Sequence, residues 1–70
     1  MFDHFHATYK QCDNPDLWNE IEGGLTYNDP INTGEFKEMT PSNQDQHLYN
    51  LAHDWGMPDD GIIIGFRVAG

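Results

Sequence analysis

Apolar residues at helical spacing mark the segment between residues 40 and 55. Thr40 is a preferred N-cap residue, and Pro41 suits the first helical position, where its missing N–H group costs nothing. Gly56 stands where a left-handed residue commonly ends a helix. The apolar positions that recur at i, i+3, i+4 and i+7 on one face are Leu48, Leu51, Ala52 and Trp55. We therefore predict one long amphipathic helix at about residues 41–55.

The two ends of the chain carry strand patterns. Residues 2–10 alternate between apolar and polar side chains, with Phe5, Ala7 and Tyr9 on one face, as in a half-buried strand. Residues 62–68 are largely apolar on both faces, which is typical of a central strand. Strict alternation would place four of them on one face, namely Ile62, Ile64, Phe66 and Val68.

A helix-start signal also lies at residues 13–16. Asp13 or Asn14 can cap a helix, and Pro15 suits its first position. The apolar residues that follow at helical spacing are Leu17, Trp18 and Ile21. Because two glycines then interrupt the pattern, we predict one short helix at about residues 15–22.

The middle third of the chain has weaker signals. Residues 25–27 and 35–39 each predict a brief strand, with a turn at residues 32–34, and an ordered loop is the alternative for part of this region. Together the elements predict the α+β class, with a small, mostly antiparallel sheet of three to four strands, the long helix and the short helix. The chain is short enough for one compact domain over residues 1–70.

The charge of the chain narrows the classes of partner. Twelve Asp and Glu residues stand against three Lys and Arg residues, which gives a formal net charge of −9. Direct binding to DNA or RNA requires cationic groups that replace the counterions around the phosphates, so the sequence disfavours it. The same charge predicts attraction to basic surfaces, including the grooves in which other proteins hold DNA or RNA.

The cysteine content and the lengths of the apolar runs indicate the cellular compartment of the protein. Cys12 is the one cysteine, which excludes an internal disulfide, whereas small secreted domains usually carry several. The longest uninterrupted apolar run in the sequence, Ile62–Ile64, is far too short to cross a bilayer. We therefore expect a cytoplasmic protein with no membrane partner, located in the host-cell cytoplasm if the protein is viral.

Histidines are the candidate metal ligands. His4 and His6 are two residues apart on a predicted strand, so their side chains share a face and could bind one ion. No third ligand accompanies them in the sequence. His47 and His53 lie about 120° apart around the long helix and cannot share an ion. We expect no bound metal, with His4 and His6 as the residues to check.

Motifs for catalysis and nucleotide binding are absent from the sequence. An EF-hand loop aligned on Gly34 would begin at Asp29. Ile31 would then occupy a position that requires an oxygen ligand, and Thr40 the position that requires a bidentate glutamate. No glycine run has the spacing of a phosphate-binding loop or a dinucleotide site. Cys12 has no activating base that the sequence identifies, so we interpret it as an inert thiol. We expect no cofactor and no enzymatic activity.

The surplus of carboxylates leads to a hypothesis about function. A small protein that places carboxylates where a partner binds phosphates could occupy a basic groove and exclude the nucleic acid. In size and charge the chain is similar to the small acidic accessory proteins of bacteriophages, including anti-CRISPR and antirestriction proteins, although no motif carries this similarity. The similarity implies a non-enzymatic inhibitor that acts as a nucleic-acid mimic on a basic nucleic-acid-binding protein or complex of a host. The predicted acidic face consists of Asp13, Asp16, Glu20, Glu22, Asp29, Glu35, Glu38, Asp59 and Asp60.

Three alternatives are open at this point. A small homodimer or subunit-type interaction module could bury exposed aromatic residues, such as Tyr27, Phe36 and Tyr49, in an interface. A His-based metal-binding protein would use His4 and His6. An acidic surface can also reflect adaptation to high salt without any partner.

Overall fold

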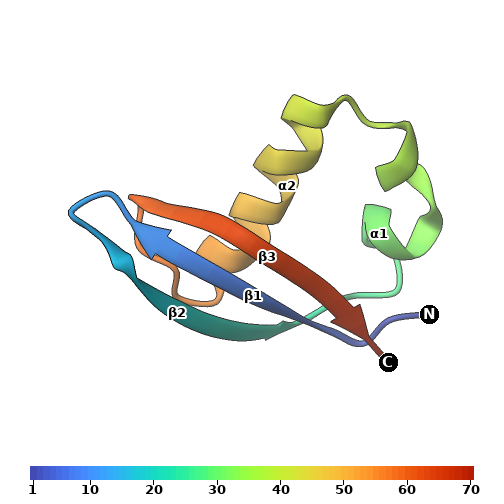
Figure 1. Cartoon of the computed structure of the whole chain (residues 1–70). Helices are drawn as coiled ribbons and strands as arrows, with labels where there is room; N and C mark the ends of the chain where they lie inside the picture. The colour runs from blue at the N-terminus through green and yellow to red at the C-terminus, as the bar shows by residue number, and fades with distance from the viewer.

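Three antiparallel strands form one sheet, and a long helix covers one of its faces (Figure 1). The computed structural model describes all 70 residues. The strands are β1 (His4–Gln11), β2 (Asn14–Gly24) and β3 (Gly61–Ala69). Their order in the sheet is β2-β1-β3, so β1 is the central strand. The predicted α+β class and the predicted first strand are confirmed.

Three helical segments connect β2 to β3, namely α1 (Pro30–Thr33), the 3₁₀ helix η1 (Glu35–Glu38) and α2 (Pro41–Asp54). The long predicted helix is confirmed as α2, together with both of its end signals. At its start, the Oγ1 atom of Thr40 accepts a hydrogen bond from the N–H of Asn43 at 3.2 Å. At its end, Gly56 has a φ of 118°, and the N–H of Met57 donates to the carbonyl of Ala52 at 3.0 Å. This is the pattern of a Schellman motif.

Residues 15–22, predicted as a short helix, lie instead in β2, and the short helix is α1. Gln11 pairs with Asn14, so Cys12 and Asp13 form the turn between β1 and β2. Asp, Asn and Pro residues favour turns as well as helix starts, and pairing with β1 decides between the two. Pro15 is tolerated because β2 is an edge strand.

The two brief strands predicted at residues 25–27 and 35–39 are also wrong. The first segment leaves the sheet and enters a turn, and the second contains η1. Asp29 and Pro30 provide the helix start in this region, since the Asp29 side chain accepts a hydrogen bond from the N–H of Ile31 at 3.0 Å. Gly34, with a φ of 89°, then ends α1.

β3 is an edge strand, although its apolar composition predicted a central one. A bulge lies at Ile64, between the pairs that Thr8 forms with Gly65 and that Tyr9 forms with Ile63. A bulge inserts an extra residue and so interrupts the alternation of faces. The β3 residues that pack against the core are Ile63, Phe66 and Val68. The predicted common face for the even-numbered residues 62–68 is therefore wrong.

The core is small and lies between the sheet and α2. Its fully buried apolar residues are Phe5, Ala7, Ala52 and Met57. The ring of Phe5 stacks on that of Phe66, with centroids 5.3 Å apart. Trp55, predicted within the apolar stripe of the helix, is 53% exposed and lies across Gly23 and Gly24 of β2.

The two chain termini meet at one end of the sheet, and the β1–β2 turn lies at the other end (Figure 1). Near the termini, the N–H of Asp3 donates to the carbonyl of Ala69 at 2.9 Å. At the opposite end, Gln11 pairs with Asn14 of β2 and with Gly61 of β3. The longest dimension of the molecule is 35 Å, so the two ends present separate surfaces.

Candidate functional site

The predicted carboxylates fall into three groups in the structure. The first lies at the end of the sheet away from the termini, is called the acidic end below, and consists of Asp13, Asp16, Asp59 and Asp60. The second lies on the face of β2 opposite α2 and consists of Glu20 and Glu22. The third lies on α1 and η1 and consists of Asp29, which caps α1, and of Glu35 and Glu38, which belong to η1. The structure thus brings part of the predicted acidic face together at one end and places the rest elsewhere.

Gln11 holds the two turns of the acidic end side by side. It is the last residue of β1 and pairs with Asn14 of β2 and Gly61 of β3. Its side-chain Nε2 donates a hydrogen bond to Oδ1 of Asp60 at 3.2 Å. The turn that contains Asp13 is therefore the neighbour of the turn that contains Asp60, although they are far apart in the sequence. All four residues of the acidic end are exposed.

Few carboxylates of this protein are neutralised by a partner. The ion pairs within 4.0 Å all involve histidine, namely His6 with Glu22 at 3.1 Å, His47 with Asp29 at 3.0 Å and His53 with Asp59 at 2.5 Å. No carboxylate pairs with Lys10, Lys37 or Arg67. Exposed and unpaired charges of one sign produce a field that attracts surfaces of the opposite sign.

Asp29 stabilises the fold and is not available to a partner. Its side chain is 9% exposed, and the same Oδ1 atom contacts Nε2 of His47 and accepts the hydrogen bond from the N–H of Ile31. This carboxylate therefore caps α1 and links it to α2. Glu35 and Glu38, by contrast, are exposed.

Replacing Asp29 by alanine is expected to lower the free energy of unfolding by about 1–2 kcal/mol, because the cap and the contact with His47 are both lost. Asparagine can still accept the cap hydrogen bond, so Asp29→Asn is expected to lose less than half as much. Denaturant unfolding followed by circular dichroism measures both variants, with Glu35→Ala as an exposed control. Equal losses in the two Asp29 variants would mean that the charge, and not the cap, provides the stability.

The face of the sheet opposite α2 is uncovered (Figure 1). A hollow of about 570 Å³ on this face is lined by Thr8, Lys10, Trp18, Glu20, Ile64 and Gly65. Trp18 is 68% exposed there. Because a cation, a carboxylate and an aromatic ring lie together on this face, it lacks the uniform negative charge of the acidic end.

His4 and His6 share this uncovered face, as their spacing predicted, with ring centroids 5.3 Å apart. The Nδ1 atom of His6 contacts a carboxylate oxygen of Glu22 at 3.1 Å. No group of three or more His, Cys, Asp or Glu side chains is placed to hold a metal ion. The structure therefore places no further metal ligand beside His4 and His6 that would complete a site. Cys12 is exposed in the β1–β2 turn.

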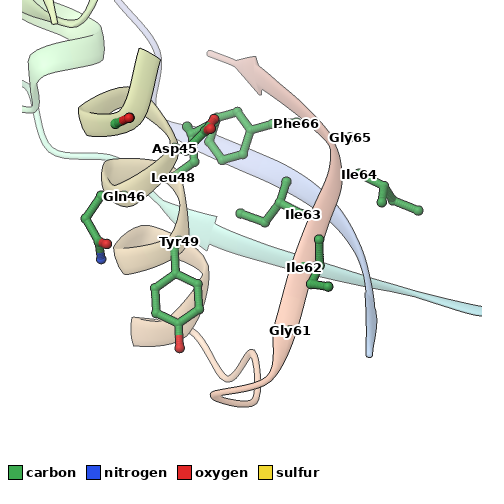
Figure 2. A pocket seen from close by; sticks show the side chains of 11 residues that line it. Asp45, Gln46, Leu48, Tyr49, Gly61, Ile62, Ile63, Ile64, Gly65 and Phe66 are labelled. Carbon is green, nitrogen blue, oxygen red and sulfur yellow. The ribbon is translucent and has the colours of Figure 1, made fainter. Parts of the chain in front are cut away.

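A groove lies between α2 and β3, and the sequence analysis did not predict it (Figure 2). It has a volume of about 670 Å³ and is called the α2–β3 groove below. Its apolar lining comes from Leu48, Tyr49, Ile62, Ile63, Ile64 and Phe66. Asp45 and Gln46 of α2 lie along its polar side. The groove is formed by α2 and β3 together, and these two segments are adjacent only in the fold. The hydrophobic pattern of either segment alone therefore could not predict it.

The chain matches no protein-family model, no curated protein and no solved structure. None of its helices combines the length and the apolar character that crossing a membrane requires.

Proposed function

We propose that the protein is a non-enzymatic inhibitor that binds the basic, nucleic-acid-binding groove of another protein through its acidic end. Its carboxylates take the place of phosphates, so DNA or RNA is excluded from the groove. The expected partner is a basic complex of a host that handles nucleic acid, of the class that anti-CRISPR and antirestriction proteins inhibit, in the cytoplasm. No direct contact with nucleic acid is involved.

One observation carries this proposal, namely that two neighbouring turns and the start of β2 present four exposed carboxylates, of which only Asp59 has an ion-pair partner, His53. The hydrogen bond from Gln11 to Asp60 and the strand pairing of Gln11 fix the two turns relative to each other. Fixed charges of one sign raise the rate of encounter with a complementary surface and oppose binding to acidic surfaces. The formal net charge of −9 means that the molecule as a whole is also attracted to basic surfaces.

Capture from a nuclease-treated host lysate tests the proposal. The immobilised protein is expected to retain basic nucleic-acid-binding proteins at about 0.1 M salt and to retain much less of them near 0.5 M, where exposed charges are screened. Added duplex DNA or RNA is expected to release the same proteins, because it competes for the groove. Captured proteins that nucleic acid does not release would contradict the mimicry.

Two matched variants locate the binding surface. The first removes the charges of the acidic end by Asp13→Asn, Asp16→Asn, Asp59→Asn and Asp60→Asn, and it is expected to lose the capture. The second removes equal charge elsewhere by Glu20→Gln, Glu22→Gln, Glu35→Gln and Glu38→Gln, and it is expected to keep most of it. Similar losses in both variants would show that net charge alone attracts the partner and would exclude a specific role of the acidic end.

A homodimer is the second candidate function, and exposed aromatic rings favour it. Tyr27 is 75% exposed and Trp18 is 68% exposed, whereas Phe36 and Tyr49 are half-buried within the fold. Burial of Trp18 against a second copy would enlarge a small core. In the salt series above, a complex held by apolar burial would persist near 0.5 M, which separates this candidate from the first.

A further inference from the structure

The outer edge of β3 is free to pair with another strand. β3 is nine residues long and pairs with β1 along one edge only. An edge strand presents a row of unpaired backbone N–H and C=O groups, which proteins commonly protect with proline or lysine. β3 contains neither residue, and its one charged side chain, Arg67, lies near its end. The free edge thus offers backbone hydrogen bonds to an extended segment.

The α2–β3 groove lies beside this free edge and would receive the side chains of an added strand. Successive side chains of a strand point to opposite faces, so every second residue of the added strand would face α2. In the groove, Ile63 points toward α2, while Ile64 points away from it (Figure 2). Backbone pairing combined with pockets for alternate side chains is the mode by which several peptide-binding domains recognise extended segments. A volume of about 670 Å³ is in the range of ligand sites.

Charge decides which extended segment fits. Asp45 is the one charged residue that lines the groove, and it comes from the α2 side (Figure 2). It has no ion-pair partner within the chain. A second copy of this protein would bring a further formal charge of −9 to the same surface, which repels it. A segment with apolar residues at alternate positions and a lysine or arginine beside Asp45 is complementary in both respects.

We propose that β3 and α2 bind an extended segment of a partner protein, in which apolar residues alternate with polar ones and a lysine or arginine faces Asp45, by addition of that segment to the free edge of β3. The groove adjoins the acidic end, since Gly61 follows Asp60 and Tyr49 donates a hydrogen bond to the carbonyl of Asp59. The site uses none of the four carboxylates of the acidic end, so it does not depend on the function proposed above. The apolar side chains of the segment fill the space beside Leu48 and Ile63, and the cation pairs with the Asp45 carboxylate.

A designed peptide with the sequence Lys-Val-Thr-Val-Thr-Val-Thr-Lys, blocked at both ends, tests the proposal. The peptide is titrated into the intact protein up to about 1 mM, and its affinity is measured by calorimetry. Binding is expected, and hydrogen exchange of the β3 amides is expected to slow by about tenfold, because edge amides become hydrogen-bonded. The absence of binding at this concentration, or binding without protection of β3, would overturn the proposal.

Two altered peptides separate the contributions of backbone and charge. Methylation of the six central backbone nitrogens prevents strand pairing but keeps the side chains, and it is expected to weaken binding by at least about tenfold. Replacement of both lysines by glutamate is expected to weaken it by a similar factor, through repulsion by Asp45. Equal affinity of the methylated peptide would overturn strand addition, and equal affinity of the glutamate peptide would overturn the charge argument.

A matched pair of protein variants tests the role of Asp45. Asp45→Asn is expected to weaken binding of the lysine peptide by about three- to tenfold, whereas Asp54→Asn, which removes the same charge from the other end of α2, leaves it unchanged. Equal effects of the two variants would mean that net charge, and not contact with Asp45, selects the peptide. Sedimentation without peptide provides the last check, since a dimer that protects the β3 amides would show that a second copy occupies the site.

Discussion

Replacing Phe5 by alanine is expected to leave the protein largely unfolded at physiological temperature. Phe5 is completely buried on the central strand, and its ring stacks on that of Phe66. Truncation of a buried phenylalanine costs about 3–5 kcal/mol, through lost burial and the cavity that remains. Small domains have only about 0.05–0.15 kcal/mol of stability per residue, so this loss approaches the whole stability of the fold. The fully buried core contains just one other large side chain, Met57, which cannot compensate.

Far-ultraviolet circular dichroism against urea concentration measures the effect of Phe5→Ala. Phe2→Ala is the matched control, because it makes the same chemical change at a residue that is 39% exposed and lies before β1. The control is expected to change the free energy of unfolding by less than about 1 kcal/mol. Where Phe5→Ala shows no transition at all, Phe5→Leu retains most of the apolar volume and is expected to restore one. Similar transitions for Phe5→Ala and Phe2→Ala would contradict the core described above.

Replacing Gly23 by alanine is expected to lower the free energy of unfolding by about 1–3 kcal/mol. Gly23 is buried in β2 beneath Trp55, and an added Cβ would overlap with the Trp55 ring and lie 2.6 Å from Cε1 of Phe5. The Phe5 ring is confined by the core, and the Trp55 atoms that would overlap are Cγ and Cδ1, close to the backbone and not at the far end of the side chain. The absence of a side chain at Gly23 is therefore what allows α2 to close onto the sheet.

Gly24 provides a control one residue away. A Cβ at Gly24 would lie 3.4 Å from the nearest Trp55 atom and 4.0 Å from the carbonyl of Asp3, so Gly24→Ala requires only a small adjustment. Its expected effect is within about 0.5 kcal/mol. The urea midpoint of the two variants is the measurement. Equal midpoints would show that the Trp55 ring does not rest on Gly23 in solution.

The elements that the sequence predicted correctly are those with local signals. The N-cap at Thr40, the left-handed residue at Gly56 and the apolar stripe between them all concern neighbouring residues, and α2 followed from them. β2 did not follow, because Asn14 and Pro15 suit a turn as well as a helix, and the deciding interaction is pairing with a strand that precedes them. The bulge at Ile64 is likewise set by register against β1, which no pattern within β3 specifies.

The candidate surfaces were predictable in composition but not in arrangement. The sequence identifies every carboxylate, yet only the fold joins the turn at Asp13 to the turn at Asp60. The sequence could not show that Asp29 is nearly buried against His47, because Asp29 caps α1 whereas His47 belongs to α2. The α2–β3 groove is open because β3 is an edge strand. The apolar composition of β3 had predicted a central strand.

The meeting of both termini at one end of the sheet determines how this molecule can be attached to other things. The acidic end lies at the opposite end of a molecule 35 Å long, and neither terminus lines the α2–β3 groove. A fluorophore, an affinity tag or a sensor chip coupled at Met1 or Gly70 therefore leaves both surfaces facing outward. A tandem fusion of two copies through a short linker would likewise project its acidic ends away from the junction and present a bivalent ligand.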